Sequence, residues 1–163
     1  MPHKMDTEAQ VFFYPDEFYP LSNFSPFRLH WHGLDFDTSE HAYHWEKFNH
    51  RLVHGTSLIQ ALIVNTTSAH EAFHIAQRHT SWVHPEWERL RVGVMRAILI
   101  AKVHQHEYVR RKLLETGERE IIEDSWRDAY WGWGPEQTGE NVLGKLWMAI
   151  REDLRDGRIE GLA

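Results

Sequence analysis

Apolar residues recur at helical spacing over most of the chain, and only the first 37 residues form short extended stretches. After the N-cap residues of 37–39, Ala42, Trp45, Phe48 and Leu52 repeat every three or four positions, which predicts a helix. Capping, proline and glycine signals predict five further helices, over about 57–64, 68–78, 85–103 and 107–115 and after Asn141.

The extended stretches predict a small β element. Residues 11–14 form a β-prone run that Pro15 interrupts, and residues 120–123 form another short strand. Residues 27–31 and 34–36 flank a turn-like His-Gly pair and predict a hairpin. The predicted fold is therefore mainly α, a single compact helical domain over residues 1–163 with a small peripheral β element. Its core spans about residues 12–154, and residues 1–10 and 156–163 are expected to be loosely ordered tails.

Charge and composition narrow the choice of partner. Acidic residues outnumber basic ones 24 to 18 and the pI is about 6.1, which argues against a protein that coats nucleic acid. The chain has no cysteine, no long apolar run and no signal-peptide pattern, so we expect a cytoplasmic protein without a membrane partner. Basic residues crowd the stretch 78–112, either as a solvated helix face or as an anion-binding rim.

Histidine is abundant, and one histidine pair has metal-ligand spacing. His70-Glu71-Ala72-Phe73-His74 matches the pattern H-E-x-x-H of zinc proteases, in which two histidines share one helix face. With 13 histidines in the chain, a match by chance is not rare, and His70 falls in the first turn of its helix. We therefore expect a histidine-rich surface helix and no metal site, with a zinc hydrolase as a remote alternative.

A polar column follows one side of the predicted helix that begins near Ser39. Glu40 and Lys47 are seven positions apart and return to nearly the same direction, with Tyr43 and His44 between them. One face thus offers a carboxylate, a phenol, an imidazole and an amine. On helix geometry alone, an ordinary solvated face with i,i+4 pairs is the favoured interpretation.

A glycine- and tryptophan-rich segment, residues 128–144, predicts a loop suited to a planar ligand. Trp131 and Trp133 alternate with glycines, which permit close approach of the backbone, and aromatic faces stack on bases. The helix that begins after Asn141 has N–H groups that could hold an oxygen-rich or anionic group, although Glu140 disfavours a strongly anionic one.

Five motifs, in order over about residues 12–154, resemble one known family, the YbiA-like N-glycosidases, also called NADAR. Two departures are His44, where the family usually has Gln, and Trp133, where a variable residue is common. The matching segments are Leu21-Ser22-Asn23-Phe24; Glu40-His41 with Lys47-Phe48; Trp87, Arg91, Val94-Met95 and Lys102; Leu113-Leu114-Glu115-Thr116-Gly117; and Asp128 to Gly132 with Gly139 to Met148.

This resemblance implies a mainly helical fold and hydrolysis of a C1′–N bond between a ribose and a base-like group. The implied substrates are small ribosyl or ADP-ribosyl molecules, namely intermediates of riboflavin biosynthesis, or ADP-ribosylated guanine in nucleic acid. No cofactor is implied, and the oligomeric state is left open. The alternative is a non-catalytic module that binds ADP-ribose or an NAD metabolite.

The resemblance also assigns roles to residues. N-glycoside cleavage passes through an oxocarbenium-like ribose, which needs negative charge near C1′ and help for the leaving nitrogen. Glu40 is expected to stabilise this charge or activate water, Asp128 to orient the ribose or act as the acid, and Lys47 to attack C1′ and form a Schiff base. The expected substrate-binding residues are Asn23, Phe24, His41, Tyr43, His44, Trp87, Arg91, Trp131, Gly132 and Asn141.

Overall fold

The computed structural model describes residues 5–13 and 17–159. The predicted end of the first strand at Tyr14, its interruption at Pro15 and the outermost residues of both tails lie outside this part. The chain divides into two compact units. The central unit is residues 26–105, and the terminal unit comprises the described residues of 1–25 and 106–163. The organisation as a single domain stays a prediction.

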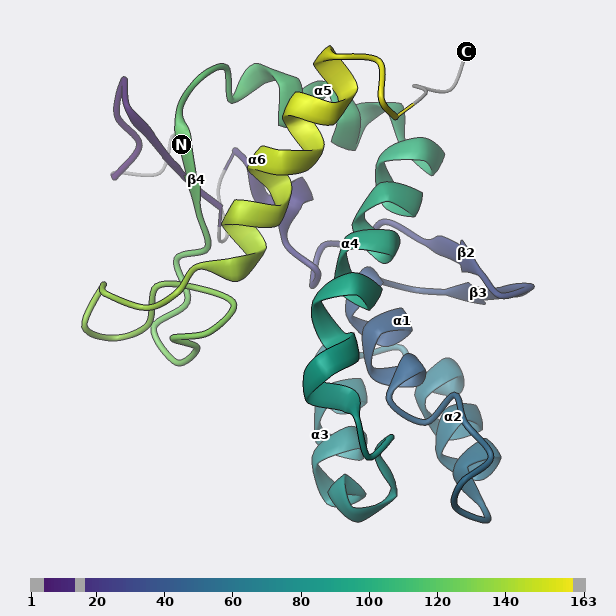
Figure 1. Cartoon of the computed structure of the whole chain (residues 1–163). Coiled ribbons are helices and arrows are strands. Elements are labelled where there is room, and N and C mark those ends of the chain that lie inside the picture. Colours follow the sequence, from purple (N-terminus) through teal and green to yellow (C-terminus); the bar gives the residue numbers. More distant parts are fainter. Residues whose placement is uncertain (1–4, 14–16, 160–163) are drawn as a thin grey trace. The chain divides into compact units, whose positions relative to one another are not determined.

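The central unit is a group of helices with a β-hairpin (Figure 1). Helix α1 contacts α2, α3 and α4, and the hairpin contacts both α1 and α4. In the hairpin Leu29 lies opposite Phe36, and both are fully buried. The Trp31 indole N–H donates to the carboxylate of Glu46 at 2.6 Å and so ties the hairpin to the end of α1. The elements are β2 (Leu29–Trp31), β3 (Leu34–Phe36), α1 (Ser39–Glu46), α2 (Thr56–Asn65), α3 (Ala69–Arg78), a 3₁₀ turn (Thr80–Trp82) and α4 (Trp87–Gln105).

The predicted caps of two helices in this unit are confirmed. The Thr38 hydroxyl accepts the backbone N–H of His41 at the start of α1, and the Ser68 hydroxyl accepts that of Glu71 at the start of α3. These hydroxyls satisfy backbone donors that have no partner within the helix.

The predicted length of α1 is wrong. The helix ends at Glu46 and does not continue to Leu52, which is 68% exposed. The carbonyl of Lys47 accepts the N–H of His84 at 2.8 Å, so the chain leaves the helix to join the turn before α4.

The terminal unit is built around a parallel pair of strands and a long helix. Val11 pairs with Ile121 across 110 positions of sequence, and both side chains are fully buried. Helix α6 packs on β4, and the indole N–H of the buried Trp147 donates to the carbonyl of Leu21 at 3.0 Å. Sequence patterns predicted both strands but not their pairing. The elements are β1 (Gln10–Phe12), a 3₁₀ turn (Tyr19–Leu21), α5 (Glu107–Glu115), β4 (Glu120–Ile122) and α6 (Val142–Arg155).

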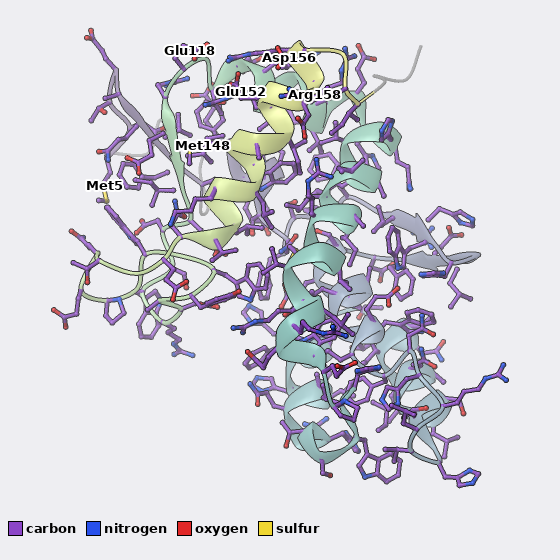
Figure 2. The ribbon with its side chains drawn as sticks, viewed as in Figure 1. Met5, Glu118, Met148, Glu152, Asp156 and Arg158 are labelled. Atoms are coloured by element: carbon purple, nitrogen blue, oxygen red, sulfur yellow. The ribbon has the colours of Figure 1, made fainter. Side chains whose placement is uncertain are left out.

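Ion pairs gather where α6 ends, and Figure 2 labels four of the participants. Arg155 bonds Glu118 at 2.6 Å and Glu152 at 2.9 Å, and Arg158 bonds Asp156 at 2.9 Å. Cations in the last turn of a helix also interact favourably with the negative end of the helix dipole. Because these pairs are exposed to solvent, they supply little net stability.

The mainly α fold class is confirmed: the described ranges hold six α-helices and two small two-stranded sheets. No helix within these ranges has the length and apolar character needed to cross a membrane.

Close packing of α6 on β4 yields a stability prediction. A Cβ at Gly144 would collide with the carbonyl oxygen of Ile121 and with the side chain of Asn141, whereas a Cβ at Gly93, an exposed glycine of α4, would meet no atom within 4 Å. Gly144→Ala should lower the free energy of unfolding by about 1–3 kcal/mol. Gly93→Ala should raise it by up to about 1 kcal/mol. Urea unfolding measures both, and equal effects would contradict the packing described here.

Candidate active site

The polar column of α1 is buried. Relative exposure is 9% for Glu40, 6% for Tyr43 and 2% for His44, because α1 is covered by α2, α3 and α4. Lys47, at the C-terminal cap of the helix, is half-buried. The interpretation as an ordinary solvated face is therefore wrong. Buried polar groups of this kind need partners, and those partners define the site.

Glu40 and His44 are hydrogen-bonded to each other. The distance from His44 Nε2 to Glu40 Oε1 is 2.7 Å, so the imidazole donates its Nε2–H to the carboxylate. The other ring nitrogen, Nδ1, is buried and has no hydrogen-bond partner among the described residues. Burial lowers the pKa of His44, against the opposing effects of the Glu40 charge and hydrogen bond. Burial thus favours the neutral form of the imidazole that donates to Glu40.

His41 uses both ring nitrogens within the protein. Nδ1 lies 2.8 Å from the Thr38 hydroxyl, and Nε2 lies 2.9 Å from the carbonyl oxygen of Thr66. Burial lowers the pKa of His41, opposed by the hydrogen bond to Thr66. The residue is fully buried and ties the start of α1 to the end of α2.

The amine of Lys47 lies within electrostatic range of Glu40 and Glu88 but forms no ion pair with the described residues. Its Nζ lies 5.2 Å from the centre of the Tyr43 ring. Burial lowers its pKa, the carboxylates of Glu40 and Glu88 raise it, and Arg91 lowers it further. Arg91 itself bonds Glu88 at 2.8 Å. A lowered pKa increases the fraction of neutral amine, the form that acts as a nucleophile.

An aromatic pair adjoins this column. The rings of Tyr43 and Trp87 are 5.3 Å apart, and Trp87 is 7% exposed at the start of α4. The central unit thus brings together six of the predicted residues: Glu40, His41, Tyr43, His44, Lys47 and Trp87, with Arg91 one turn along α4 from Trp87.

Asp128 shapes the tryptophan-rich loop of the terminal unit. Its Oδ1 accepts the backbone N–H groups of Tyr130 at 2.9 Å and Trp131 at 2.8 Å, and its own N–H donates to Ser125. A short acidic side chain that binds the backbone two and three residues ahead is a typical turn device. One carboxylate oxygen therefore organises the backbone, which the sequence reasoning did not anticipate.

Asn141 connects α6 to β4. Its Oδ1 accepts the N–H of Glu123 at 3.0 Å and its Nδ2 donates to the carbonyl of Ile121 at 2.9 Å, with the backbone at a φ of 49°. The expectation of free N–H groups at this helix start is wrong for residues 139–143. Each of those N–H groups donates to a carbonyl of the loop 129–133.

The loop glycines pack against backbone. A Cβ at Gly132 would lie 2.7 Å from the carbonyl oxygen of Glu123, and one at Gly139 would lie 2.5 Å from that of Ala129. The rings of Trp133 and Phe12 are 4.8 Å apart, and the indole N–H of Trp133 donates to Asp124 at 3.0 Å. Trp133 therefore packs against β1 and bonds within the terminal unit. Close backbone packing therefore explains glycines that sequence reasoning assigned to ligand approach.

Three other predicted residues also lie in the terminal unit. Trp131 is half-buried, with its ring 5.0 Å from that of Tyr130. Asn23 is 5% exposed, and the neighbouring Phe24 is half-buried with its carbonyl accepting the Tyr19 hydroxyl at 3.0 Å.

The histidine pair of α3 lies at the surface. His70 and His74 are exposed, and Glu71 bonds Arg78 at 2.7 Å. Within residues 5–13 and 17–159, no three histidine or acidic side chains gather as a metal site would require.

Lys102 was not assigned a role by sequence reasoning. It is fully buried in α4, and burial lowers its pKa to about 7. Its Nζ lies 3.5 Å from the Ser39 hydroxyl and 5.5 Å from the centre of the Phe27 ring. The sequence did mark Lys102, because it lies in one of the five motifs that resemble the family.

Comparison with known proteins identifies the family of the chain. The model of the NADAR domain family matches residues 11–155. The chain belongs to the NADAR domain family. It is 34% identical over 151 residues to a riboflavin biosynthesis protein of Vibrio vulnificus, covering 91% of this chain but 40% of that protein's length.

Other relatives match over most of their length. An N-glycosidase of Nostoc punctiforme is 32% identical, and the match covers 83% of this chain and 85% of the relative. The N-glycosidase YbiA of Escherichia coli is 31% identical, and the match covers 91% of this chain and 89% of YbiA. The solution structure of E. coli YbiA superposes with a TM-score of 0.81 at 30% identity, covering 98% of this chain and 92% of that one. The resemblance seen in the sequence is thereby confirmed.

The role of Asp128 in shaping its loop can be tested by two variants. Asp128→Ala removes the acceptor of two backbone N–H groups and should lower the free energy of unfolding by about 1–2 kcal/mol. Asp128→Asn retains an acceptor oxygen and should lower it by less than about 0.5 kcal/mol. Urea unfolding measures both, with Glu136→Ala, a change at an exposed acid of the same loop, as the control. Equal losses in the Ala and Asn variants would contradict this role.

Proposed function

We propose that this protein cleaves the C1′–N bond between a ribose and a base-like leaving group in a phosphorylated riboside of riboflavin biosynthesis. The chain is a hydrolase acting on N-glycosyl bonds, since relatives that it matches over most of their length are N-glycosidases. The relationship to a riboflavin biosynthesis protein supports the substrate class. ADP-ribosylated guanine in nucleic acid is the second substrate class to test.

The observation that carries the proposal is the buried carboxylate of Glu40. An oxocarbenium-like ribose carries positive charge at C1′, and a fixed negative charge stabilises it most strongly where water is scarce. Glu40 offers such a charge: Oε1 is bonded to His44, and the side chain keeps 11% exposure. It can therefore face C1′ or hold the attacking water there.

Lys47 supplies a covalent route through its neutral amine. Nζ attacks C1′ as the bond to the leaving nitrogen breaks, and that nitrogen takes a proton from an acid, the role we propose for Asp128. Nζ then gives up a proton, the C1′–O4′ bond breaks with that proton passing to O4′, and the opened ribose is left joined to Nζ through a protonated imine at C1′. Water adds to the imine carbon and releases the sugar and the free lysine, so no redox partner is needed.

Aromatic and polar residues complete the proposed site. Trp131 and Trp87 would stack on the base, and Tyr43 and Arg91 would contact the substrate from α1 and α4. His44 was also expected to bind substrate, but it is 2% exposed and would act through its hydrogen bond to Glu40. In the terminal unit, Asn23, Phe24, Gly132 and Asn141 are proposed to contact the sugar or phosphate.

We also propose a cytoplasmic location. The chain has no cysteine to pair in an oxidising compartment, which supports this assignment.

The proposed function predicts base release from a defined substrate. The wild type should release the base from a ribosylamino-pyrimidinedione phosphate, as detected by mass spectrometry, with ADP-ribosylated guanine DNA tested in parallel. Glu40→Gln, nearly isosteric but uncharged, should lower kcat by at least about a hundredfold. His74→Gln, on the exposed face of α3, should have wild-type activity, also in the presence of EDTA.

Each contrary outcome rejects a particular part of this account. Normal turnover in Glu40→Gln rejects the site. Calorimetric binding of ADP-ribose without any base release on prolonged incubation identifies a non-catalytic binder. Loss of activity both in EDTA and in His74→Gln supports the zinc hydrolase. Release from ADP-ribosylated guanine alone replaces the proposed substrate class with the second one.

A further inference from the structure

The buried imidazole of His44 has one ring nitrogen in use and one without a partner. Nε2 lies 2.7 Å from Glu40 Oε1, and Nδ1 is buried with no hydrogen-bond partner among the described residues. Imidazole and carboxylate lie one helical turn apart on α1, where i and i+4 side chains meet. A buried polar atom without a partner is costly, so this arrangement calls for an explanation.

The ring is enclosed by aromatic side chains. The Tyr43 ring lies 5.3 Å from the His44 ring, and the Phe73 ring of α3 lies 5.7 Å from it, both edge-on. Neither neighbour offers the Nδ1 position a hydrogen-bond acceptor in the described contacts. A proton on Nδ1 would therefore be buried without an acceptor, which favours the tautomer that carries its hydrogen on Nε2.

From these contacts we infer that His44 is a positioning residue, which fixes the Glu40 carboxylate by donating its Nε2–H to Oε1 and leaves the other oxygen for the substrate. Oε2 accepts no hydrogen bond from the described residues, while the Glu40 side chain keeps part of its exposure. The inference rests on the proposed function insofar as it assigns the reaction to Glu40.

The charged groups near the pair do not replace this donor. His41 of α1 and Lys47 at its C-terminal cap lower the pKa of His44 through their charges. Glu88 and Arg91 of α4 act in turn on the pKa of Lys47. Lys47 forms no ion pair with the described residues, and His41 is engaged with Thr38 and Thr66. His44 is thus the one described residue that donates a hydrogen bond to the Glu40 carboxylate.

A matched pair of variants separates the donor from the bulk of the ring. Gln places an amide N–H at about the reach of Nε2, whereas Met has the same chain length and no donor. His44→Gln should keep kcat within about threefold of wild type on the ribosylamino-pyrimidinedione phosphate. His44→Met should lose about ten- to a hundredfold in kcat with KM within about twofold, since a hydrogen bond to a charged group is lost. Equal activity in the two variants, whether retained or lost, overturns the inference.

A second measurement is made on the wild type without substrate and does not depend on whether His44→Met folds. In ¹⁵N-histidine spectra of the wild type at pH 7, His44, assigned by the signal that His44→Gln removes, should show a protonated Nε2 and a bare Nδ1. A protonated Nδ1, in either a neutral or a charged ring, overturns the inference. Failure of the proposed function appears instead as unchanged turnover in Glu40→Gln, which leaves the spectrum of His44 in the wild type as predicted.

Discussion

The hydrogen bond between His44 Nε2 and Glu40 Oε1 is the interaction on which the candidate site depends. A carboxylate that is 9% exposed on a helix covered from three sides would be costly without a donor. At 2.7 Å, the imidazole supplies that donor without adding a second buried charge, because burial lowers the pKa of His44. The result is a carboxylate whose orientation is fixed before any substrate binds, the condition under which electrostatic stabilisation is most effective.

The surrounding elements serve to hold this short helix in place. Thr38 caps its start, and His41 ties that end to α2. At the other end, the indole N–H of Trp31 in the hairpin donates to Glu46, the last residue of the helix. Helix α1 has only eight residues, a length that is marginal for an isolated helix, so tertiary contacts must supply most of its stability. The same contacts bury the polar column and thereby lower the pKa of Lys47.

Local signals in the sequence predicted the helices and their caps, because capping residues and apolar spacing act over a few positions. They could not predict the burial of the α1 column, since helical geometry shows which residues share a face but not what covers that face. The pairing of β1 with β4 joins residues about 110 positions apart and leaves no local signal. The close packing of Gly132 and Gly139 left no local signal for a related reason: the backbone that they approach, at Glu123 and Ala129, is brought to them only by folding of the chain.

The central claim is that the α1 column performs the chemistry at C1′, with Lys47 as the group that forms the covalent bond. Trapping tests this claim most directly. Borohydride added during turnover should reduce the imine between Nζ and the sugar and leave a stable mass increase on the peptide that contains Lys47. Lys47→Arg should give no adduct. An adduct mapped to another lysine, such as the buried Lys102, or active enzyme that yields no adduct at all, would contradict the account.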